Sequence, residues 1–365
     1  MPLRVAIVSE YVRPWPGGIS EHVHHEAHEL RGRGHTVTVF SGPDGVDSGR
    51  AGEVGGDVVR LPRSVTFRGN GARSRLSFGA SLLRLGKVLD RSRFDVVHVH
   101  APLDPLLGVA SVLAAKVPVV GTFHASHGRT PGFRMLLGTP WSRRAFAKLH
   151  TRVAVSEEAR RTVGAFFEGA VTVVPNGVDT ARFHPEHRVV PAAPTLLFVG
   201  RPDARKGLAH ALAAFARVRR TVTDARLVLA GPSLADVGPE VPPGVAALGY
   251  VASHDLPRIV ASADVLVAPS LANESQGIVL LEAMASGVVP VAYRIPGYDE
   301  TVRDGEDGVL VPRADVPAFA DAVTDLLEDP ERRMRMSSAA VRRAATYAWT
   351  SVAPRIESLL VVAAS

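Results

Sequence analysis

The start of the chain decides the fold: residues 3–40 read LRVAIVSEYVRPWPGGISEHVHHEAHELRGRGHTVTVF. The mostly apolar run at 3–9 predicts a buried strand. A turn rich in proline and glycine follows at 14–18, and an amphipathic pattern then predicts a helix over 19–33. Residues 36–40 predict the next strand. A strand, a glycine-rich turn, a helix and a second strand together form the opening βαβ unit of a doubly wound parallel sheet.

The same alternation continues to the end of the chain. Further strands of the first sheet are predicted at 95–100, 117–122, 152–155 and 171–174, with helices near 105–115 and 139–149 and another capped by Ser156. The segment HPEHRVVPAAP at 184–194 indicates a linker. A second run follows, with strands at 195–200, 225–230, 245–248, 265–268, 288–292 and 308–311 and helices at 207–221, from 253, 278–286 and 316–327.

This pattern predicts the α/β class, with two Rossmann-like doubly wound domains that face a cleft. We expect a first domain over 1–188 and a second over 189–347. A C-terminal helix at about 348–365 is expected to pack back on the first domain. Ligands are expected at the carboxyl ends of the strands, where open parallel sheets bind them.

Composition narrows the chemistry. The 365 residues are 46% hydrophobic and include no cysteine, which excludes disulfides, thiolate catalysis and cysteine-ligated metal centres. No apolar stretch reaches the roughly 18 residues of a membrane span, and the N-terminus lacks the pattern of a signal peptide. We therefore expect a cytoplasmic protein, and no motif predicts a cofactor or a metal site.

The net charge of +6 is unevenly distributed. Residues 1–190 carry 25 basic and 16 acidic residues, whereas residues 191–365 carry 17 and 20. The first half therefore favours an anionic partner, unless the excess only reflects an arginine-rich composition, since four of the 42 basic residues are lysines. No basic stripe is interleaved with aromatic residues, so no nucleic-acid partner is expected.

A first candidate site follows the strand that opens the second run. Gly200 and Arg201 end this strand, and Lys206 stands five residues later at the start of a helix. A glycine allows the backbone to approach a ligand closely, while arginine and lysine bind phosphate oxygens. The amide groups and dipole of the helix start favour an anion as well. A solvated charge cluster is the alternative interpretation.

A second candidate site is the stretch ESQGIVLLEAMASG at 274–287. Glu274 falls in the loop before a helix and suits contacts with sugar hydroxyls, whereas Glu282 falls within the helix and suits a ribose diol. The backbone amides of Gln276, Gly277 and Ile278 stand at the helix N-terminus, where they can bind a β-phosphate. The alternative for Glu282 is an ordinary helix-face charge, although its neighbours are apolar.

Several histidines are candidates for functional or structural roles. His124 follows an apolar strand and so lies where ligands bind, which favours a functional role. His98 and His100 are interpreted as packing or hydrogen-bonding residues. Four histidines share the first helix: His22, His24, His25 and His28. Of these, His24 and His28 have the spacing to chelate a metal, but a solvated helix face is the preferred interpretation.

Four motifs in order resemble a known family. The Pro-Gly-Gly turn at 16–18, the segment PNGVD at 175–179, Gly200-Arg201 with Lys206-Gly207, and the glutamate pair at 274 and 282 resemble the retaining glycosyltransferases of family 4. Within that family the chain looks most similar to the actinobacterial phosphatidylinositol mannosyltransferases. The resemblance covers nearly the whole chain and implies the two-domain GT-B fold.

The resemblance also implies residue roles. Arg201 and Lys206 would hold the donor diphosphate, with Gly17 and Gly18 facing it from the first domain. Glu282 would bind the ribose and Glu274 the transferred sugar. His124 would contact the sugar near the reacting carbon, so that the predicted catalytic set is His124, Arg201, Lys206 and Glu274. Acceptor contacts are expected from Tyr11, Arg75 and Asn176, and contacts with the donor base near Val251.

The predicted function is transfer of a hexose, in the first instance mannose, from a GDP- or UDP-sugar to an acceptor hydroxyl. The acceptor implied by the resemblance is a phosphatidylinositol-type headgroup. The eight basic residues between Arg63 and Arg93, beside apolar side chains such as Phe78, Leu82 and Leu89, predict an amphipathic segment on an anionic membrane surface. The alternatives are an ordinary surface helix for this segment and, for the chain, a soluble acceptor, an epimerase or a non-catalytic binding protein.

Overall fold

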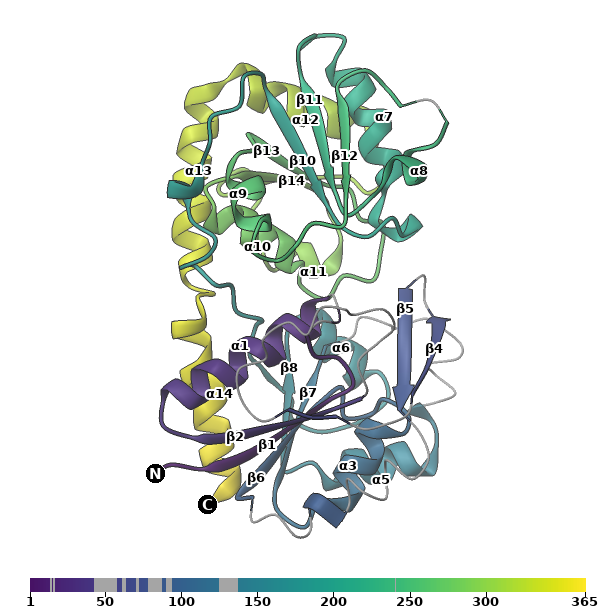
Figure 1. Cartoon of the computed structure of the whole chain (residues 1–365), viewed down its shortest axis with the longest axis vertical. Helices are drawn as coiled ribbons and strands as arrows, with labels where there is room; N and C mark the ends of the chain where they lie inside the picture. Colours follow the sequence, from purple (N-terminus) through teal and green to yellow (C-terminus); the bar gives the residue numbers. More distant parts are fainter. Residues whose placement is uncertain are drawn as a thin grey trace. The chain divides into compact units, whose positions relative to one another are not determined.

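The computed structural model describes residues 1–13, 15, 17–42, 58–60, 64–69, 72–77, 87–89, 94–124, 137–239 and 241–365, with backbone alone at 60, 64–69 and 72–77. The chain divides into two compact units (Figure 1). The N-terminal unit comprises Met1–Gly177 and Trp349–Ser365, and the C-terminal unit is Val178–Ala348. The change after Gly177 lies upstream of the segment 184–194, where the linker was predicted.

The N-terminal unit is built on a parallel sheet, as predicted. Its described strands lie in the order β3-β2-β1-β6-β7-β8-β9. Their bounds are β1 (Arg4–Ser9), β2 (Thr36–Ser41), β3 (Val58–Arg60), β6 (Val96–His100), β7 (Val119–Phe123), β8 (Thr151–Ala154) and β9 (Thr172–Val173). The order reverses at β1, between β2 and β6, which makes this the switch point of the sheet.

Helices cover both faces of this sheet. They are α1 (Gly18–Gly32), α3 (Leu107–Ala114), α5 (Pro140–Lys148), α6 (Glu157–Gly164) and α14 (Trp349–Ala364). Successive residues of β1 enter different core clusters: Ala6 packs in one, and Val5 packs in the other with residues of α1 and α14. The predicted cap is confirmed, since the Ser156 hydroxyl accepts a hydrogen bond from the Ala159 amide.

An antiparallel pair, β4 (Ser64–Gly69) and β5 (Ala72–Ser77), was not predicted. It contains part of the basic segment, and Arg75 lies opposite Thr66 in its register. Of the expected amphipathic segment, residues 87–89 are described: Lys87 is exposed, whereas Leu89 is buried in the core. Phe78, Leu82 and residues 90–93 lie outside the described residues.

The C-terminal unit contains a second parallel sheet, in the order β12-β11-β10-β13-β14-β15. Its strands are β10 (Thr195–Val199), β11 (Arg226–Ala230), β12 (Val245–Gly249), β13 (Val265–Ala268), β14 (Val289–Tyr293) and β15 (Val309–Val311). Its helices are α7 (Leu208–Val218), α8 (Leu234–Val237), α9 (Leu256–Ala261), α10 (Ile278–Ala285), α11 (Pro296–Asp299), α12 (Val316–Glu328) and α13 (Pro330–Ala345). The predicted α/β class with two doubly wound sheets is confirmed.

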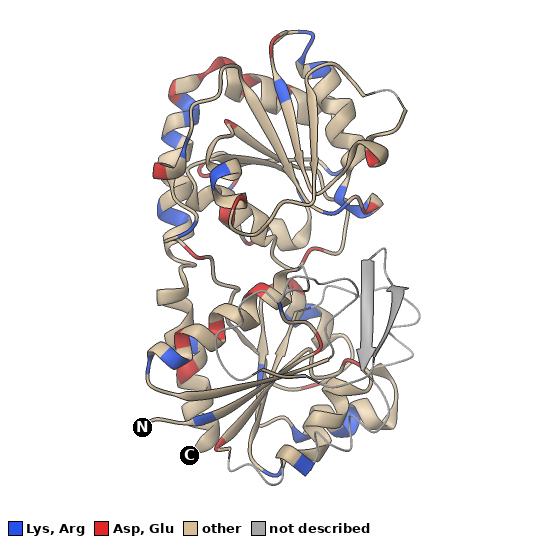
Figure 2. Cartoon of the chain, in the orientation of Figure 1, with Lys and Arg blue, Asp and Glu red and all other residues tan. Residues whose placement is uncertain are grey.

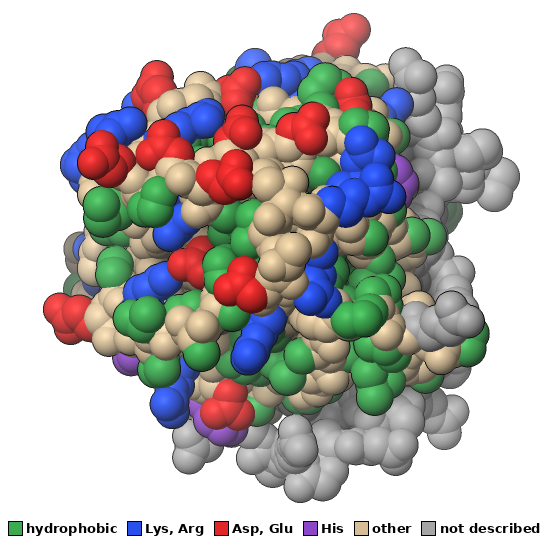
Figure 3. All heavy atoms as spheres, turned by 90° about the horizontal axis from the view of Figure 1, so that it is seen from above, with side chains coloured by type: hydrophobic (Ala, Val, Ile, Leu, Met, Phe, Trp, Pro, Cys, Tyr) green, Lys and Arg blue, Asp and Glu red, His purple; other side chains and the backbone are tan. Residues whose placement is uncertain are grey.

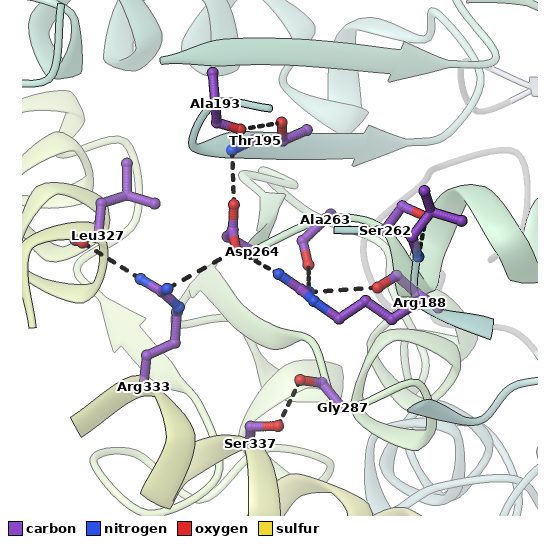
Figure 4. A network of polar contacts seen from close by, with 12 residues as sticks. Arg188, Ala193, Thr195, Ser262, Ala263, Asp264, Gly287, Leu327, Arg333 and Ser337 are labelled. Atoms are coloured by element: carbon purple, nitrogen blue, oxygen red, sulfur yellow. Dashed lines mark hydrogen bonds and ion pairs between the residues drawn. The ribbon is translucent and has the colours of Figure 1, made fainter. Parts of the chain in front are cut away.

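Asp264, just before β13, ties the segment that precedes β10 to the rest of the C-terminal unit (Figure 4). Its carboxylate lies 2.7 Å from the Arg188 guanidinium and accepts a hydrogen bond of 2.9 Å from the Thr195 amide. Arg333 of α13 lies 3.8 Å from the same carboxylate. Since the Asp264 side chain is only 9% exposed, this network fixes where the first strand of the sheet begins.

Lys and Arg residues and Asp and Glu residues both occur in each of the two units (Figure 2). The face seen in Figure 3 also shows basic and acidic side chains interspersed with apolar ones. None of the described helices is both long and apolar enough to cross a bilayer.

Candidate functional site

The loops after β10 and β13 meet at the switch point of the C-terminal unit. These strands are neighbours, and the backbone amide of Leu271 in the second loop donates to the carbonyl of Arg205 in the first at 2.7 Å. Gly207 permits the contact, because it has φ 74° and a Cβ there would lie 2.0 Å from the carbonyl oxygen of Pro269. The sequence-distant motifs at 200–207 and 274–282 are thereby brought together, as predicted for a shared site.

The two loops contribute a compact group of charges. The carboxylate of Glu274 lies 2.7 Å from Lys206 Nζ and 3.0 Å from the Arg205 guanidinium. Arg205 also donates to the Asn273 carbonyl at 3.1 Å. Arg201 instead pairs with Asp203 in its own loop, at 3.3 Å. Sequence reasoning missed Arg205, although its position beside Lys206 was a usable signal.

The N-terminus of α10 borders this group. Gly277 is its N-cap and offers no side chain to cap the helix. The Leu280 amide donates to the Gly277 carbonyl, so the amides of Ile278 and Val279 are the ones that this helix start can offer to an anion. Gln276 is buried, and its backbone carbonyl accepts a hydrogen bond from the Thr301 hydroxyl at 2.6 Å. Glu282 lies one turn into α10 and is half-buried.

Tyr298 packs against the loop between β13 and α10. Its hydroxyl donates to Ser270 Oγ at 2.9 Å, and the ring is 2.4 Å from where a Cβ on Gly277 would stand. Burial, with the negative charge of Glu274, raises the pKa of Tyr298 well above its usual range. The hydroxyl therefore remains a hydrogen-bond donor at neutral pH and holds the loop in place.

The other residues predicted to bind the nucleotide-sugar donor come from both units. Gly200 directly follows β10, and its amide donates to the Ala230 carbonyl at 3.0 Å. Val251 follows β12 and packs partly against the core. Gly17 and Gly18 form the N-cap and first residue of α1.

The predicted acceptor residues are in the N-terminal unit. Tyr11 follows β1, and its ring centroid lies 5.9 Å from that of Trp15. Asn176 is buried, with its Oδ1 atom 2.9 Å from His22 Nδ1. Arg75 lies on β5, where the backbone alone is described. Their shared role in binding the acceptor stays a prediction.

His124 lies directly after β7 and joins a buried polar cluster. Its Nε2 atom is 2.9 Å from Nδ1 of His100, and His98 contacts Glu26 and Thr122. The interpretation of His98 and His100 as hydrogen-bonding residues is confirmed. The solvated-face interpretation is confirmed for His28, which is exposed. It is wrong for His22, which is 2% exposed, because His22 lies on the inward side of α1, one turn from Glu26.

The protonation states of this cluster follow from its burial. Burial lowers the pKa of His100 to about 4 and the pKa of His124 well below its usual range, so both rings are neutral at pH 7. Burial opposes ionisation of Glu26, but its electrostatic interactions with the neighbouring histidines outweigh this cost and lower the Glu26 pKa. The cluster therefore combines a buried carboxylate with the neutral rings of His100 and His124.

Comparison with known proteins agrees with this geometry. Residues 16–182 match the family model "Glycosyltransferase Family 4", and residues 193–329 match "Glycosyl transferases group 1". The chain is 35% identical to phosphatidyl-myo-inositol mannosyltransferase of Mycobacterium tuberculosis, over 97% of this chain and 95% of the relative. It is also 32% identical to glycogen synthase of the same species, over 96% and 92%.

Solved structures share the fold. A complex of Anabaena Alr3699/HepE with UDP and glucose is similar with a TM-score of 0.77 and 18% identity, over 99% of this chain and 100% of that one. Sucrose-phosphate synthase from Thermosynechococcus elongatus is similar with a TM-score of 0.78 and 21% identity, over the full length of both chains. The chain therefore belongs to glycosyltransferase family 4, and it is a glycosyltransferase with the GT-B fold.

Proposed function

We propose that this enzyme transfers mannose from GDP-mannose to a hydroxyl of a phosphatidylinositol-type headgroup, with retention of the anomeric configuration. The support for the acceptor is the identity of 33–35% to phosphatidyl-myo-inositol mannosyltransferases over 97% of the chain. The support for a nucleotide-sugar donor is the charge group at the C-terminal switch point, beside the amides of α10.

The charge group suits a diphosphate leaving group. Breaking the anomeric bond places negative charge on the β-phosphate, and fixed positive groups lower the barrier by stabilising that charge. Lys206 and Arg205 lie within 3.0 Å of Glu274, and these ion pairs position both cations. The first-turn amides of α10 add donors that need no rearrangement.

Glu274 has a second role in this proposal. Its carboxylate lies next to two cations, and it can accept hydrogen bonds from hydroxyls of the transferred sugar. Glu282, one turn into α10, binds the ribose diol. Arg201 is 40% exposed and paired with Asp203, so it turns to the diphosphate on binding. His124 contacts the sugar from the N-terminal unit, and Tyr11, Arg75 and Asn176 contact the acceptor.

The basic segment between Arg63 and Arg93 would bring the enzyme to an anionic membrane surface. Each basic residue near such a surface contributes about 1 kcal/mol, so several give salt-sensitive binding. The described part is consistent with a limited role for its apolar residues, since Leu89 is already buried in the core. A peripheral location at the inner face of the cell membrane is part of this proposal.

A soluble glycan is the second candidate acceptor. The identity of 32% to a glycogen synthase, over 96% of the chain, is nearly as high as the identity to the lipid-headgroup enzymes. In both candidates the C-terminal unit would bind the nucleotide-sugar donor and the N-terminal unit would bind the acceptor.

The test has two stages. A thermal-shift panel of GDP, UDP and ADP first identifies the base, because a ligand at 100 times its dissociation constant adds about 2.7 kcal/mol of stability. Transfer from the matching mannose and glucose donors is then measured with phosphatidylinositol in vesicles and with glycogen. We expect a GDP shift and mannolipid product; glycogen labelling with no lipid product would favour the second candidate.

Co-sedimentation with vesicles tests the membrane part separately. Binding to anionic vesicles that weakens with salt, and no binding to neutral vesicles, is the expected result. Protein that stays in the supernatant at low salt would remove the membrane surface and leave the transferase proposal intact.

A further inference from the structure

Three buried side chains of the N-terminal unit converge on one point. His22 and Glu26 come from successive turns of α1, and His100 comes from the end of β6. Their Nε2, Oε2 and Nε2 atoms all lie within 4.8 Å of one another. Each of the three side chains is at most 2% exposed.

The spacing of these atoms is that of ligands on a common ion. Oε2 of Glu26 lies 3.3 Å from His22 Nε2 and 3.1 Å from His100 Nε2. Bonds of about 2.0–2.2 Å in a tetrahedral zinc site separate neighbouring ligand atoms by roughly 3.3 Å. Within the described part of the chain, none of the three atoms has a hydrogen-bond partner. Buried polar atoms without a partner are costly, and a cation between them would remove that cost.

The remaining polar atoms of the same side chains are held by neighbours. His22 Nδ1 lies 2.9 Å from Asn176 Oδ1, and His100 Nδ1 lies 2.9 Å from His124 Nε2. Hydrogens on both Nδ1 atoms would leave the Nε2 lone pairs directed at the shared point. Metal-binding imidazoles in proteins are oriented in this way.

The carboxylate is held in the same manner. Oε1 of Glu26 lies 2.6 Å from His98 Nδ1, and His98 Nε2 lies 2.7 Å from the Thr122 hydroxyl. Oε2 is thereby turned to the two imidazoles. A full set of outer hydrogen bonds around three ligand atoms is expected of a metal site rather than of a chance contact.

We propose that His22, Glu26 and His100 bind a divalent transition metal ion, with zinc as the expected ion. Two imidazoles and one carboxylate are a common ligand set for zinc with a fourth position open. The ion would join α1 to β6 and, through His100, fix the ring of His124. This goes beyond the proposed transfer reaction, for which no metal was predicted.

The test uses the full chain, purified from zinc-supplemented medium with an affinity tag that lacks histidine. We expect about one equivalent of zinc by elemental analysis. Replacement by cobalt after chelation should give the visible absorption of a tetrahedral or five-coordinate N/O site. Because the cluster is buried, reconstitution should require hours or partial unfolding.

Glu26→Gln tests the assignment, since it keeps the shape of the side chain and should weaken cobalt binding at least 100-fold. The control is the double variant His24→Gln/His28→Gln on the same helix, which should bind cobalt as the wild type does. Circular dichroism and a cooperative thermal unfolding transition report whether each variant is folded. Wild-type protein without stoichiometric metal, or undiminished binding in folded Glu26→Gln, would overturn the proposal, and the cluster would then be a hydrogen-bonded network.

Discussion

The two sheets reverse their strand order in the same way, yet they present different chemistry at that point. In the C-terminal unit, the loops after β10 and β13 bring Lys206, Arg205 and Glu274 together at 10–20% side-chain exposure. In the N-terminal unit, the corresponding elements around β1, β6 and β7 bury His22, Glu26, His100 and His124.

The difference lies in which element supplies the charged groups. In the C-terminal unit they come from loops, which leave side chains accessible to a ligand. In the N-terminal unit they come mainly from the inward side of α1 and from strand ends, so burial shifts their pKa values and ties them to one another. A shared topology therefore fixes where a site lies, and the local elements decide whether it binds a ligand or holds the protein together.

The largest expected effect is on the accessible site. Lys206→Ala should lower turnover about 100-fold or more, because losing one positioned contact to the leaving group costs about 3 kcal/mol. Steady-state kinetics with the preferred donor measures it. Arg217→Ala, on the exposed side of α7 in the same unit, is the control and should have near-normal activity. A fully active Lys206→Ala enzyme would show that the charge group is structural.

The next effect concerns the contact that brings the two loops together. Gly207→Ala should lower the free energy of unfolding by about 2–3 kcal/mol, since the new Cβ meets the Pro269 carbonyl and the φ of 74° is unfavourable for alanine. Gly305→Ala has a similar positive φ of 78° but no atom within 4 Å, so it reports the cost of φ without the close approach. Equal losses in chemical denaturation would mean that the close approach contributes nothing.

A smaller effect separates the two glutamates. Glu282→Ala should weaken binding of the free nucleoside diphosphate about tenfold, or about 1.4 kcal/mol. Glu274→Ala should leave that binding nearly unchanged and reduce sugar transfer, because its proposed contact is with the sugar. Calorimetry with the diphosphate, followed by transfer kinetics, measures both. The reverse pattern would exchange the two roles.

Hydrophobic periodicity was sufficient to predict the strands of both sheets except β3. It placed β1, α1 and β2 within a residue or two, because buried strands and amphipathic helices have distinct periods. It did not predict α13, although Asp329 and Pro330 form a normal helix start in which the Asp329 side chain accepts from the Arg332 amide. The β4–β5 pair was missed because its sequence is polar and basic.

The loop motifs predicted the accessible site, since glycines and charges near helix starts are visible in the sequence. The buried cluster was not predicted, because side chains from α1, β6 and β7 meet only in the folded sheet. A partial signal existed, because His22 and Glu26 lie on the same face of α1 as Val23, Ala27 and Leu30, which are its buried apolar residues. Because histidine is commonly exposed, a solvated helix face was preferred over this pattern.

The smallest predicted effect is a pH dependence of stability at the switch point of the N-terminal unit. Two carboxylic acids stand there, whereas the corresponding point of the C-terminal unit has cations. Asp104 follows β6 and Glu10 follows β1, and these strands are neighbours. Burial, with the negative charge of Glu10, raises the pKa of Asp104 from 3.8 to about 7. The folded protein therefore keeps a proton on Asp104 at pH 5–6, whereas the unfolded chain has lost it.

Unfolding then releases a proton, so the contribution of Asp104 to stability is lost as pH rises from about 4 to about 7. Asp104→Asn removes this loss, and its Tm relative to wild type should rise over the same range. Because Asp104 is only partly buried, we expect a change of about 1 kcal/mol, or about 2–4 °C for a unit of this size. Thermal unfolding of both proteins at pH 4, 6 and 8 measures it, and comparing differences across pH cancels any constant effect of the substitution. A Tm difference that is the same at all three pH values would show that the carboxyl is ionised in the folded protein and that this edge of the sheet tolerates two negative charges.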